Sequence, residues 1–242
     1  MGLWRYNADG IDMVSSQDVT IADCFVRAFD DNIVLKGGRN RQQQAPGMNV
    51  KNIEVRNCVL WNDWGRALEI GAETVADSIC DIRFIDNDII HFVHMAMSIQ
   101  NGDRAKVSRI LYKDIRVEQP IKELARIADY TYQPEEIGRL IDLNVRDNRY
   151  SRDTMRGKIE NITFRNITYT GTFFPVTSMQ GLGVDHDVSN ILFENIVING
   201  ERVRNTEDLK LQRSTPVGGD GSVGTEDLKL QDSDFVSNIT VK

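Results

Sequence analysis

The chain has 242 residues, 40% of them hydrophobic and 27% charged, so it can bury one sizeable core and lacks the composition of a disordered protein. Its formal net charge of −7 argues against the basic surface that nucleic-acid binding requires. No apolar run is long enough to span a bilayer. We therefore expect neither nucleic acid nor a membrane among its partners.

The first predicted strands lie in residues 7–37, a region that is rich in acids although its apolar residues alternate as they do in β-strands. Acids crowd both edges of these strands. We expect some of these acids to be structural and others to be catalytic. The region contains Asp9, Asp12, Asp18, Asp23, Asp30 and Asp31.

A sequence repeat runs through the chain from this region onward. Each copy has a polar residue, two apolar residues at alternate positions, an Asp or Asn, and a second apolar pair. The copies are DVTIADCFV, NIEVRNCVL, DIRFIDNDI, RILYKDIRV, NITFRNITY and NILFENIVI, and a further NITV begins at Asn238. Spacings in the second polar column are 34, 29, 28, 52 and 29 residues, and the column comprises Asp23, Asn57, Asp86, Asp114, Asn166 and Asn195.

Alternation at period two predicts strands, and a repeat of about 30 residues with several strands per copy predicts a solenoid. Because Asn and Asp tolerate left-handed backbone angles, a column of them fits a bend that recurs at one place in every coil. The sequence therefore predicts an all-β protein with a right-handed, single-stranded parallel β-helix. Asp18 and Asp23 lie in the two polar columns, and we interpret both as turn-forming residues.

We expect one β-helix domain over residues 1–242, with insertions at about 118–157 and 203–235. Residues 120–140 interrupt the repeat, as a short helix or a side loop, and account for the spacing of 52. The second insertion contains TEDLKLQ twice, starting at Thr206 and Thr225, and we interpret it as a solvated loop.

Asp9, Asp30 and Asp31 remain as candidates for chemistry. Asp9 and Asp30 are 21 residues apart, and adjacent coils of a stacked sheet lie roughly 4.8 Å apart. These acids can therefore meet on one face, where mutual repulsion raises some of their pKa values. Hydrolysis of a glycosidic bond needs such a set, with a protonated acid for the leaving oxygen and an ionised partner for water. Alternatively, Asp30 and Asp31 cap the strand end and bind a cation or water.

The segment NADGID, followed one coil later by DD with SQDVTI between them, resembles the polygalacturonases and their relatives with a pectin-lyase-like β-helix. Those enzymes carry an Asn-Thr-Asp-Gly segment and then an Asp-Asp pair at this spacing. The resemblance implies an inverting glycoside hydrolase that cleaves a polysaccharide or oligosaccharide. It also implies that Asp30 is the general acid and that Asp9 and Asp31 activate water, while Asp12 turns or hydrogen-bonds the strand end.

The chain departs from the polygalacturonase pattern in two places. Where those enzymes have a Gly-His-Gly segment, this chain has NDWGRALEIGAET, without a histidine. Where they have an Arg-x-Lys pair that holds the uronate carboxylate, it has Ser98 and Gln100. The dextranase and isopullulanase group is similar in using three aspartates without the histidine. Neutral glucans therefore remain candidate substrates. We therefore expect a substrate other than simple polygalacturonate.

Five further residues are candidates for substrate binding. Trp64 either stacks on a sugar or anchors a loop, and Lys36 either reaches an acidic sugar or joins a solvated basic patch. Arg66 lies in the segment that lacks the histidine. Glu69 and Glu73 follow on the same coil and would supplement or replace an acid, although Glu69, inside an apolar strand, is equally well an outward-facing residue.

No cofactor and no metal ion is expected, because His91 and His94, three residues apart, have no third ligand nearby. A polysaccharide lyase is an alternative, since lyases share this fold and often use a basic residue with calcium. A third hypothesis is a non-catalytic carbohydrate-binding or structural β-helix fragment.

The acid-rich region begins at residue 7, whereas family members carry several coils and a cap ahead of it, so we expect a β-helix without these N-terminal coils and cap. The last repeat runs off the C-terminus. Exposed coil ends favour pairing with another chain, which predicts a homo-oligomer. The resemblance implies an extracellular or periplasmic location, although residues 1–10 lack the features of a signal peptide.

Overall fold

The computed structural model describes residues 7–38, 47–119, 126–127, 130–131, 138–216, 230–231 and 234–242. These residues form strands and turns, and none of them belongs to a helix able to cross a membrane. The strands are β1 (Ile11–Val14), β2 (Gln17–Ala22), β3 (Phe25–Ala28), β4 (Ile33–Gly37), β5 (Val50–Arg56), β6 (Val59–Asn62), β7 (Arg66–Thr74), β8 (Ser78–Ile85), β9 (Asp88–His91), β10 (Met95–Asn101), β11 (Lys106–Gln119), β12 (Arg126–Ile127), β13 (Tyr130–Thr131), β14 (Arg139–Val145), β15 (Lys158–Gly171), β16 (Val176–Gln180), β17 (Val188–Ile198), β18 (Glu201–Arg202), β19 (Leu211–Pro216), β20 (Leu230–Gln231) and β21 (Val236–Val241).

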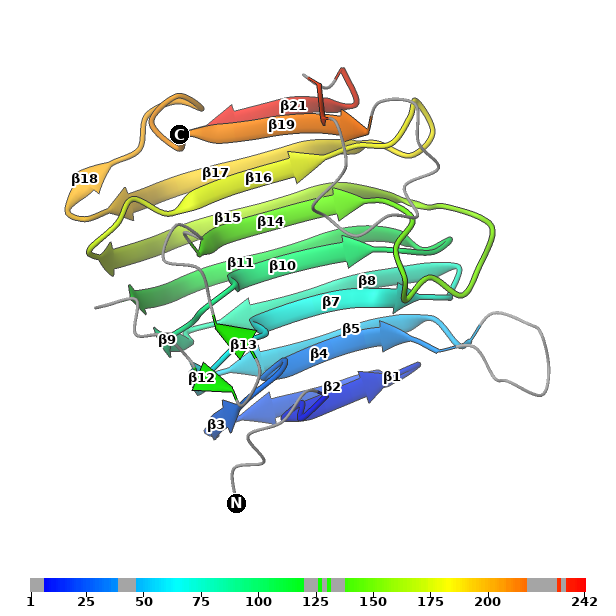
Figure 1. The fold of residues 1–242 in the computed structure, drawn as a ribbon, viewed down its shortest axis with the longest axis horizontal. Helices are drawn as coiled ribbons and strands as arrows, with labels where there is room; N and C mark the ends of the chain where they lie inside the picture. Colours follow the sequence, from blue (N-terminus) through cyan, green and yellow to red (C-terminus); the bar gives the residue numbers. More distant parts are fainter. Residues whose placement is uncertain are drawn as a thin grey trace.

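Two long sheets face each other across the core, and the coils stack from β1 and β2 to β19 and β21 (Figure 1). The front sheet has the order β1-β4-β7-β10-β14-β16-β19-β20, and the main path of the back sheet is β18-β17-β15-β11-β8-β5-β2, with β21 beside β17. Successive coils pair in parallel, and the antiparallel pairs among the described strands are β12–β13, β17–β18 and β19–β20. The parallel β-helix predicted from the repeat is confirmed.

The core consists of in-register stacks of like residues, because each coil places its inward apolar side chains directly above those of the coil before. One stack in the back sheet is aromatic, with ring centroids 4.7 Å apart between Phe84 and Tyr112, 4.9 Å between Tyr112 and Phe164, and 5.2 Å between Phe164 and Phe193. All four side chains are fully buried. Such contacts stabilise beyond the burial of area alone, by about 0.5–1.5 kcal/mol per aromatic pair.

Both polar columns of the repeat adopt left-handed backbone angles. In the second column φ lies between 51° and 58° at each member, from Asp23 to Asn195. The first column behaves alike, with φ 58° at Asp18 and 54° at Asn52, and even its one long side chain, Arg109, has φ 56°. At each such residue the alternation of inward and outward side chains shifts by one position. The apolar residues on both sides of it therefore still point inward. Asp23 lies in the bend between β2 and β3, as interpreted from the sequence, whereas Asp18 has the same left-handed angle within β2.

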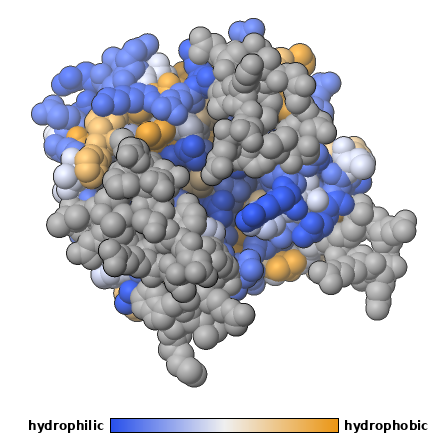
Figure 2. Space-filling view, viewed as in Figure 1, coloured by the Kyte–Doolittle hydropathy of each residue, from blue (hydrophilic) through white to orange (hydrophobic). Residues whose placement is uncertain are grey.

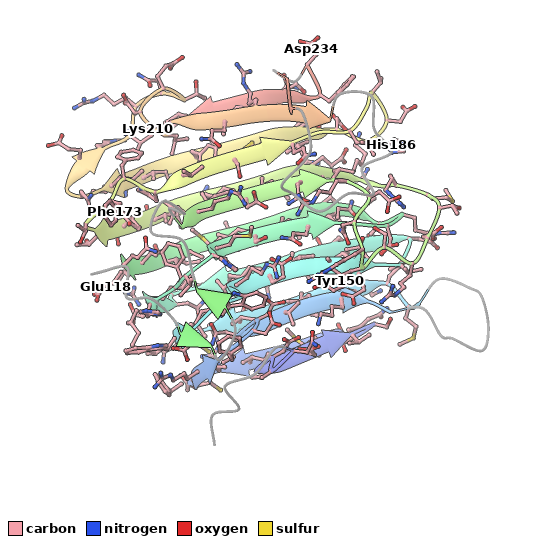
Figure 3. All side chains as sticks on the ribbon, viewed as in Figure 1. Glu118, Tyr150, Phe173, His186, Lys210 and Asp234 are labelled. Carbon is pink, nitrogen blue, oxygen red and sulfur yellow. The ribbon has the colours of Figure 1, made fainter. Side chains whose placement is uncertain are left out.

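The solenoid has two edges, which Figure 3 marks by labelled side chains. His186 lies between β16 and β17, where the chain passes from the front sheet to the back sheet. Phe173 lies between β15 and β16, where the chain returns to the front sheet. Asp30 and Asp31, between β3 and β4, and Trp64, between β6 and β7, lie in turns of this second kind, which we call the return edge.

The predicted insertions fall largely outside the described residues. Within residues 118–157 the structure describes the short hairpin β12–β13 and the turns after β14, and within 203–235 it describes the first TEDLKLQ copy up to β19. The second copy, apart from Leu230–Gln231, lies outside the described part, and the division into one domain with two insertions stays a prediction.

The second polar column predicts a stability effect at Asp23. Asn57 Nδ2 donates a hydrogen bond of 2.6 Å to Asp23 Oδ1, and Asp23 has φ 58°. Asp23→Ala removes this bond and places alanine in a left-handed conformation, so the free energy of unfolding in urea should fall by about 1–3 kcal/mol. Asp23→Gly, which loses the bond but adopts positive φ freely, should lose less. An alanine variant as stable as the parent chain would contradict this role.

Candidate active site

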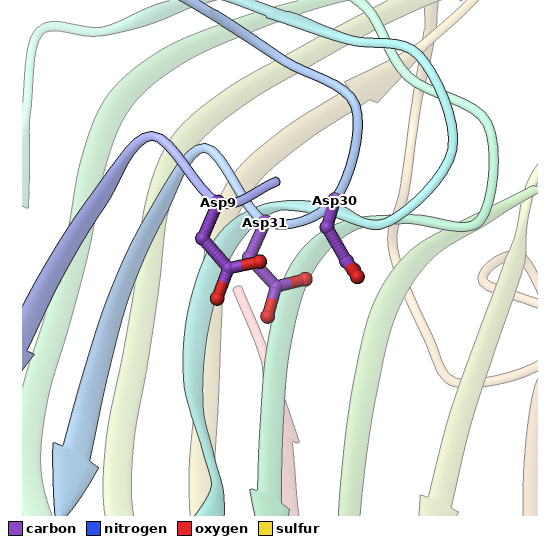
Figure 4. A group of neighbouring side chains, drawn as sticks. All are labelled: Asp9, Asp30 and Asp31. Atoms are coloured by element: carbon purple, nitrogen blue, oxygen red, sulfur yellow. The ribbon is translucent and has the colours of Figure 1, made fainter. Parts of the chain in front are cut away.

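The turn that enters β4 and the segment before β1 bring three carboxylates together. β1 and β4 pair in parallel, and the pairing continues before the strands, where the Gly10 N–H donates to the Asp31 carbonyl at 2.8 Å. Oxygen atoms of Asp9, Asp30 and Asp31 lie within 4.8 Å of one another. Figure 4 shows the three side chains projecting from neighbouring segments of backbone into the same region. The expectation that these acids meet is confirmed.

Two buried asparagines and a glycine fix the turn that carries this cluster. The Asn62 side-chain amide donates to the backbone carbonyls of Asp30, at 2.5 Å, and of Arg66, at 3.2 Å. The Asn32 amide donates to two further carbonyls at 3.1 and 2.9 Å. Gly65 passes so close to Asp30 that a Cβ would lie 2.7 Å from the Asp30 Oδ1. The β6–β7 turn therefore holds Asp30 in place from the next coil.

Burial raises the pKa values of two of the three acids. For Asp31, burial together with the charges of Asp30 and Asp9 outweighs the nearby Arg66 guanidinium and raises the pKa to about 7. For Asp30, burial again raises the pKa, opposed by the Asn7 N–H, which donates to Asp30 Oδ2 at 2.9 Å. The cluster can therefore hold a proton near neutral pH beside an ionised carboxylate.

Carboxylates at this spacing have two ordinary chemical uses. They share protons and transfer them to and from a substrate, or they bind a cation. Among the described residues, Asp9, Asp30 and Asp31 are the group of three His, Cys, Asp or Glu side chains whose atoms lie close enough to hold a metal ion. The raised pKa values of Asp30 and Asp31 fit proton sharing.

Lys36 binds two acids at the edge of this cluster. Its Nζ donates to Asp9 Oδ2 and to Asp12 Oδ2, both at 2.9 Å. Burial lowers the pKa of Lys36, but these two bonds raise it further, and the result lies above the ordinary value. The ammonium group is therefore occupied, and an acidic sugar would have to compete with Asp9 and Asp12 for it.

Arg66 lies at the start of β7 against Asp31. Its backbone N–H donates to Asp31 Oδ1 at 3.0 Å, and its guanidinium Nη1 lies 3.7 Å from the same atom. Glu69 follows on the outer face of β7, yet only 1% of its surface is exposed, and the Ser98 hydroxyl on β10 interacts with its carboxylate without normal hydrogen-bond geometry. Burial, opposed by Arg66 and assisted by Asp31, raises the pKa of Glu69 to about 8.

The remaining candidates differ in their distance from the acids. Trp64 stacks on Phe29, with centroids 5.7 Å apart, and meets the ring of His94 edge-on at 5.1 Å. It therefore packs within the return edge beside the cluster. Glu73 is four residues beyond Glu69 along β7, about 13 Å at the rise of an extended strand, and the structure does not bring it to the other acids.

Asn32, Asn62 and Gly65 were not identified from the sequence. Asn62 and Gly65 belong to NDWG, a composition typical of a turn, which was a usable signal for the turn itself. That the asparagine amide points back to the preceding coil depends on the register between coils, which one sequence does not contain. Ser98 and Gln100, noted as departures from the family pattern, lie on β10, with Ser98 opposite Glu69.

Similarity to known proteins identifies the family of the chain. A model of the glycosyl hydrolases family 28 matches residues 5–215, and the chain belongs to this family. It is 26% identical over 200 residues to a probable endopolygalacturonase D of Neosartorya fischeri. Among solved structures it is similar in fold to a hyperthermoactive exopolygalacturonase of Thermotoga maritima, with a TM-score of 0.56 and 18% identity. The resemblance to polygalacturonase-like enzymes is confirmed.

The chain is much shorter than these two proteins. The matched region covers 81% of this chain but 36% of the curated relative, and likewise 81% of this chain but 45% of the solved structure. It therefore spans less than half of each.

Glu69 predicts an unusual dependence of stability on pH. Its carboxyl keeps a proton in the folded chain up to about pH 8, whereas in the unfolded chain it loses the proton near 4.5. The folded state thus binds more protons between these values, and stability falls as pH rises through that window. The raised pKa of Asp31 likewise makes stability fall as the pH rises from 3.8 to about 7. Glu69→Gln removes the first contribution and should raise stability at pH 8 by up to about 4 kcal/mol.

The measurement is urea unfolding of both proteins at pH 5 and pH 8. Glu73→Gln, the same change on a partly exposed residue of the same strand, is the control and should leave the slope unchanged. A Glu69→Gln variant that keeps the full loss of stability between pH 5 and pH 8 would show that Glu69 is ionised in the folded chain.

Proposed function

We propose that this chain is an inverting glycoside hydrolase in which Asp30 protonates the leaving glycosidic oxygen and Asp9 and Asp31 activate the attacking water. The observation that carries the proposal is the cluster of three carboxylates within 4.8 Å, two of them with raised pKa values, in a member of a glycosyl hydrolase family. Glycoside hydrolysis needs one carboxyl group protonated and one ionised at the same pH.

The step that these residues perform is a single displacement. Asp30 donates its proton to the oxygen of the scissile bond as that bond to the anomeric carbon breaks. A water held by Asp9 and Asp31 attacks the anomeric carbon from the opposite face and gives a proton to the carboxylate. Arg66, 3.7 Å from Asp31, favours the ionised form of that base. Lys36 Nζ donates to Asp9 Oδ2 at 2.9 Å and holds that carboxylate in position.

Inversion rests on the sequence resemblance. Inverting enzymes usually hold their two carboxyl groups about 6.5–9.5 Å apart and retaining enzymes about 5–5.5 Å apart. Atoms of this cluster approach more closely than either class, so the spacing alone does not predict the stereochemistry. Proton NMR of the first-formed sugar anomer would decide it, and a product with the configuration of the substrate would contradict inversion.

The named relatives make polygalacturonate the first substrate to test, since both are described as polygalacturonases. The expectation from Ser98 and Gln100 is the opposite and stays a prediction. A screen of polygalacturonate and neutral glucans, read as new reducing ends, should show the faster rate on a neutral glycan. Faster cleavage of polygalacturonate would contradict the expectation, and unsaturated products in place of new reducing ends would identify a lyase.

Substitution of the three acids tests their roles. Asp30→Asn, Asp9→Asn and Asp31→Asn should each lower the rate of hydrolysis about a hundred- to ten-thousand-fold, because each removes a general acid or base. Their melting temperatures should stay the same or rise, since each change removes a charge from a crowded cluster. The rates are measured on the best substrate of the screen.

Asp18→Asn is the matched control, because it makes the same chemical change in the first polar column, outside the cluster, where Asp18 accepts a hydrogen bond from Asn52. Its activity should equal that of the parent chain. Full activity in Asp30→Asn or Asp31→Asn would show the mechanism to be wrong. Unfolding of these variants would show that the two acids serve the fold.

A further inference from the structure

Two of the three cysteines of the chain occupy the same position in successive coils. Cys24 follows Asp23 between β2 and β3, and Cys58 follows Asn57 between β5 and β6. The strands on both sides of these bends pair in register, β2 with β5 and β3 with β6, and the Val59 N–H donates to the Cys24 carbonyl at 2.8 Å. The register therefore places Cys24 directly opposite Cys58.

The two thiols make the same local contact and interact with each other. The Cys24 Sγ donates to the Ala22 carbonyl at 3.1 Å, and the Cys58 Sγ donates to the Arg56 carbonyl at 3.3 Å. Because each thiol reaches back two residues along its own coil, the two side chains lie parallel. The Cys24 side chain is among the groups that act on the Cys58 thiol. Both cysteines are free in this structure.

Cys58 belongs to the core, and Cys24 packs at its border. Figure 2 shows hydrophilic side chains over much of the described surface, and apolar side chains gather between the sheets, where Cys58 is 1% exposed. Burial raises the pKa of the Cys58 thiol. Cys24, by contrast, is partly exposed. A reagent in the solvent therefore meets the Cys24 thiol first.

The next coil shows how a side chain at this position links neighbouring coils. Asn87 takes the place of a third cysteine, and its amide donates to the Val55 carbonyl at 3.0 Å. Its Oδ1 accepts a hydrogen bond of 3.0 Å from the Cys58 N–H. Two hydrogen bonds thus tie the coil of Asn87 to the coil before it, whereas the thiols of Cys24 and Cys58 donate within their own coils.

The separation of the two cysteines suits a disulfide. Adjacent coils lie roughly 4.8 Å apart, and disulfides usually join residues whose Cα atoms are about 4.4–6.8 Å apart. Cys80 lies opposite Lys51, which precedes Cys58 by seven residues, so it is roughly 20 Å away along the strand and out of reach. The extracellular or periplasmic location that the family resemblance implies is one in which disulfides form and persist.

We propose that Cys24 and Cys58 form a disulfide that links their two coils. The Cys24 thiolate attacks one sulfur of a small disulfide oxidant, such as oxidised glutathione, and one glutathione thiolate leaves. The Cys58 thiolate then attacks the Cys24 Sγ of this mixed disulfide, the Cys24–Cys58 bond forms, and the second glutathione thiolate leaves. The two cysteines lose two electrons and two protons, which the two glutathione sulfurs take up. This inference is independent of the proposed function.

The link stabilises the coils that hold Asp30. Cys24 precedes Asp30 by six residues, and Cys58 precedes Asn62, whose amide donates to the Asp30 carbonyl at 2.5 Å, by four. A bond between residues 34 positions apart restricts the unfolded chain and so favours the folded one. For a chain of this size, the usual worth of a disulfide corresponds to a rise in melting temperature of about 4–16 °C.

The test is oxidation of the folded chain with excess oxidised glutathione, followed by a count of free thiols in denaturant and by peptide mapping without reductant. The parent chain should lose two of its three thiols and yield one pair of peptides joined through Cys24 and Cys58. Its melting temperature should rise, and dithiothreitol should reverse both changes. Cys24→Ser and Cys58→Ser should form no internal cross-link and show no such rise.

Cys80→Ser is the matched control, because it makes the same change at a buried cysteine outside the pair and should keep both the cross-link and the rise. Three free thiols after oxidation, a glutathione adduct of Cys24 that persists without a cross-link, or a cross-link that involves Cys80 or joins two chains would overturn the proposal. A Cys24–Cys58 bond that leaves the melting temperature unchanged or lowers it would overturn it as well, since the native coils would then not accommodate the bond.

Discussion

In-register stacking of parallel strands is the constraint on which the rest of this structure depends. Because every coil repeats the path of the coil before it, residues separated by one coil in the sequence are neighbours in space. This places Asp9 beside Asp30 and Asp31, and it places Ser98 beside Glu69. The left-handed residues of the polar columns keep this register, since each of them lets a long strand bend without turning its apolar side chains outward. The acid cluster is thus a consequence of the same geometry that forms the core.

The stability of the cluster depends on the cost of burying its carboxylate charges and on the few groups that compensate those charges. Three carboxylates would repel one another strongly if all were ionised, and water is largely excluded from Asp30 and Asp31, which are 8% and 7% exposed. Lys36 compensates Asp9, Arg66 compensates Asp31, and backbone N–H groups donate to Asp30 and Asp31. What remains uncompensated is met by a proton that the cluster holds near neutral pH.

Much of this arrangement could be predicted from the sequence, because it is periodic. The repeat identified the β-helix, and the two polar columns identified Asp18 and Asp23 as residues of the fold. The coil length then predicted that the remaining acids, Asp9, Asp30 and Asp31, lie close together. What the sequence did not disclose depends on register at the level of single side chains. Nothing local indicates that Asn62 reaches the backbone of Asp30, or that Gly65 leaves room for it.

Two further features depend on the same register. Glu69 is an outward-facing residue by alternation, and its burial is visible only once β10 and the neighbouring turns stand beside it. The sequence left two interpretations of Lys36, a contact with the substrate or part of a solvated basic patch. In the fold Lys36 binds Asp9 and Asp12.

The claim that a buried proton resides among Asp9, Asp30 and Asp31 is tested most directly by a carbon-13 NMR titration of the aspartate side-chain carboxyl groups in the folded chain. We predict that one aspartate carboxyl titrates with a midpoint near pH 7 and that this titration disappears in Asp31→Asn. If every aspartate carboxyl of the folded chain titrates within the ordinary range, around 3.9, the cluster holds no proton at neutral pH, which contradicts this prediction.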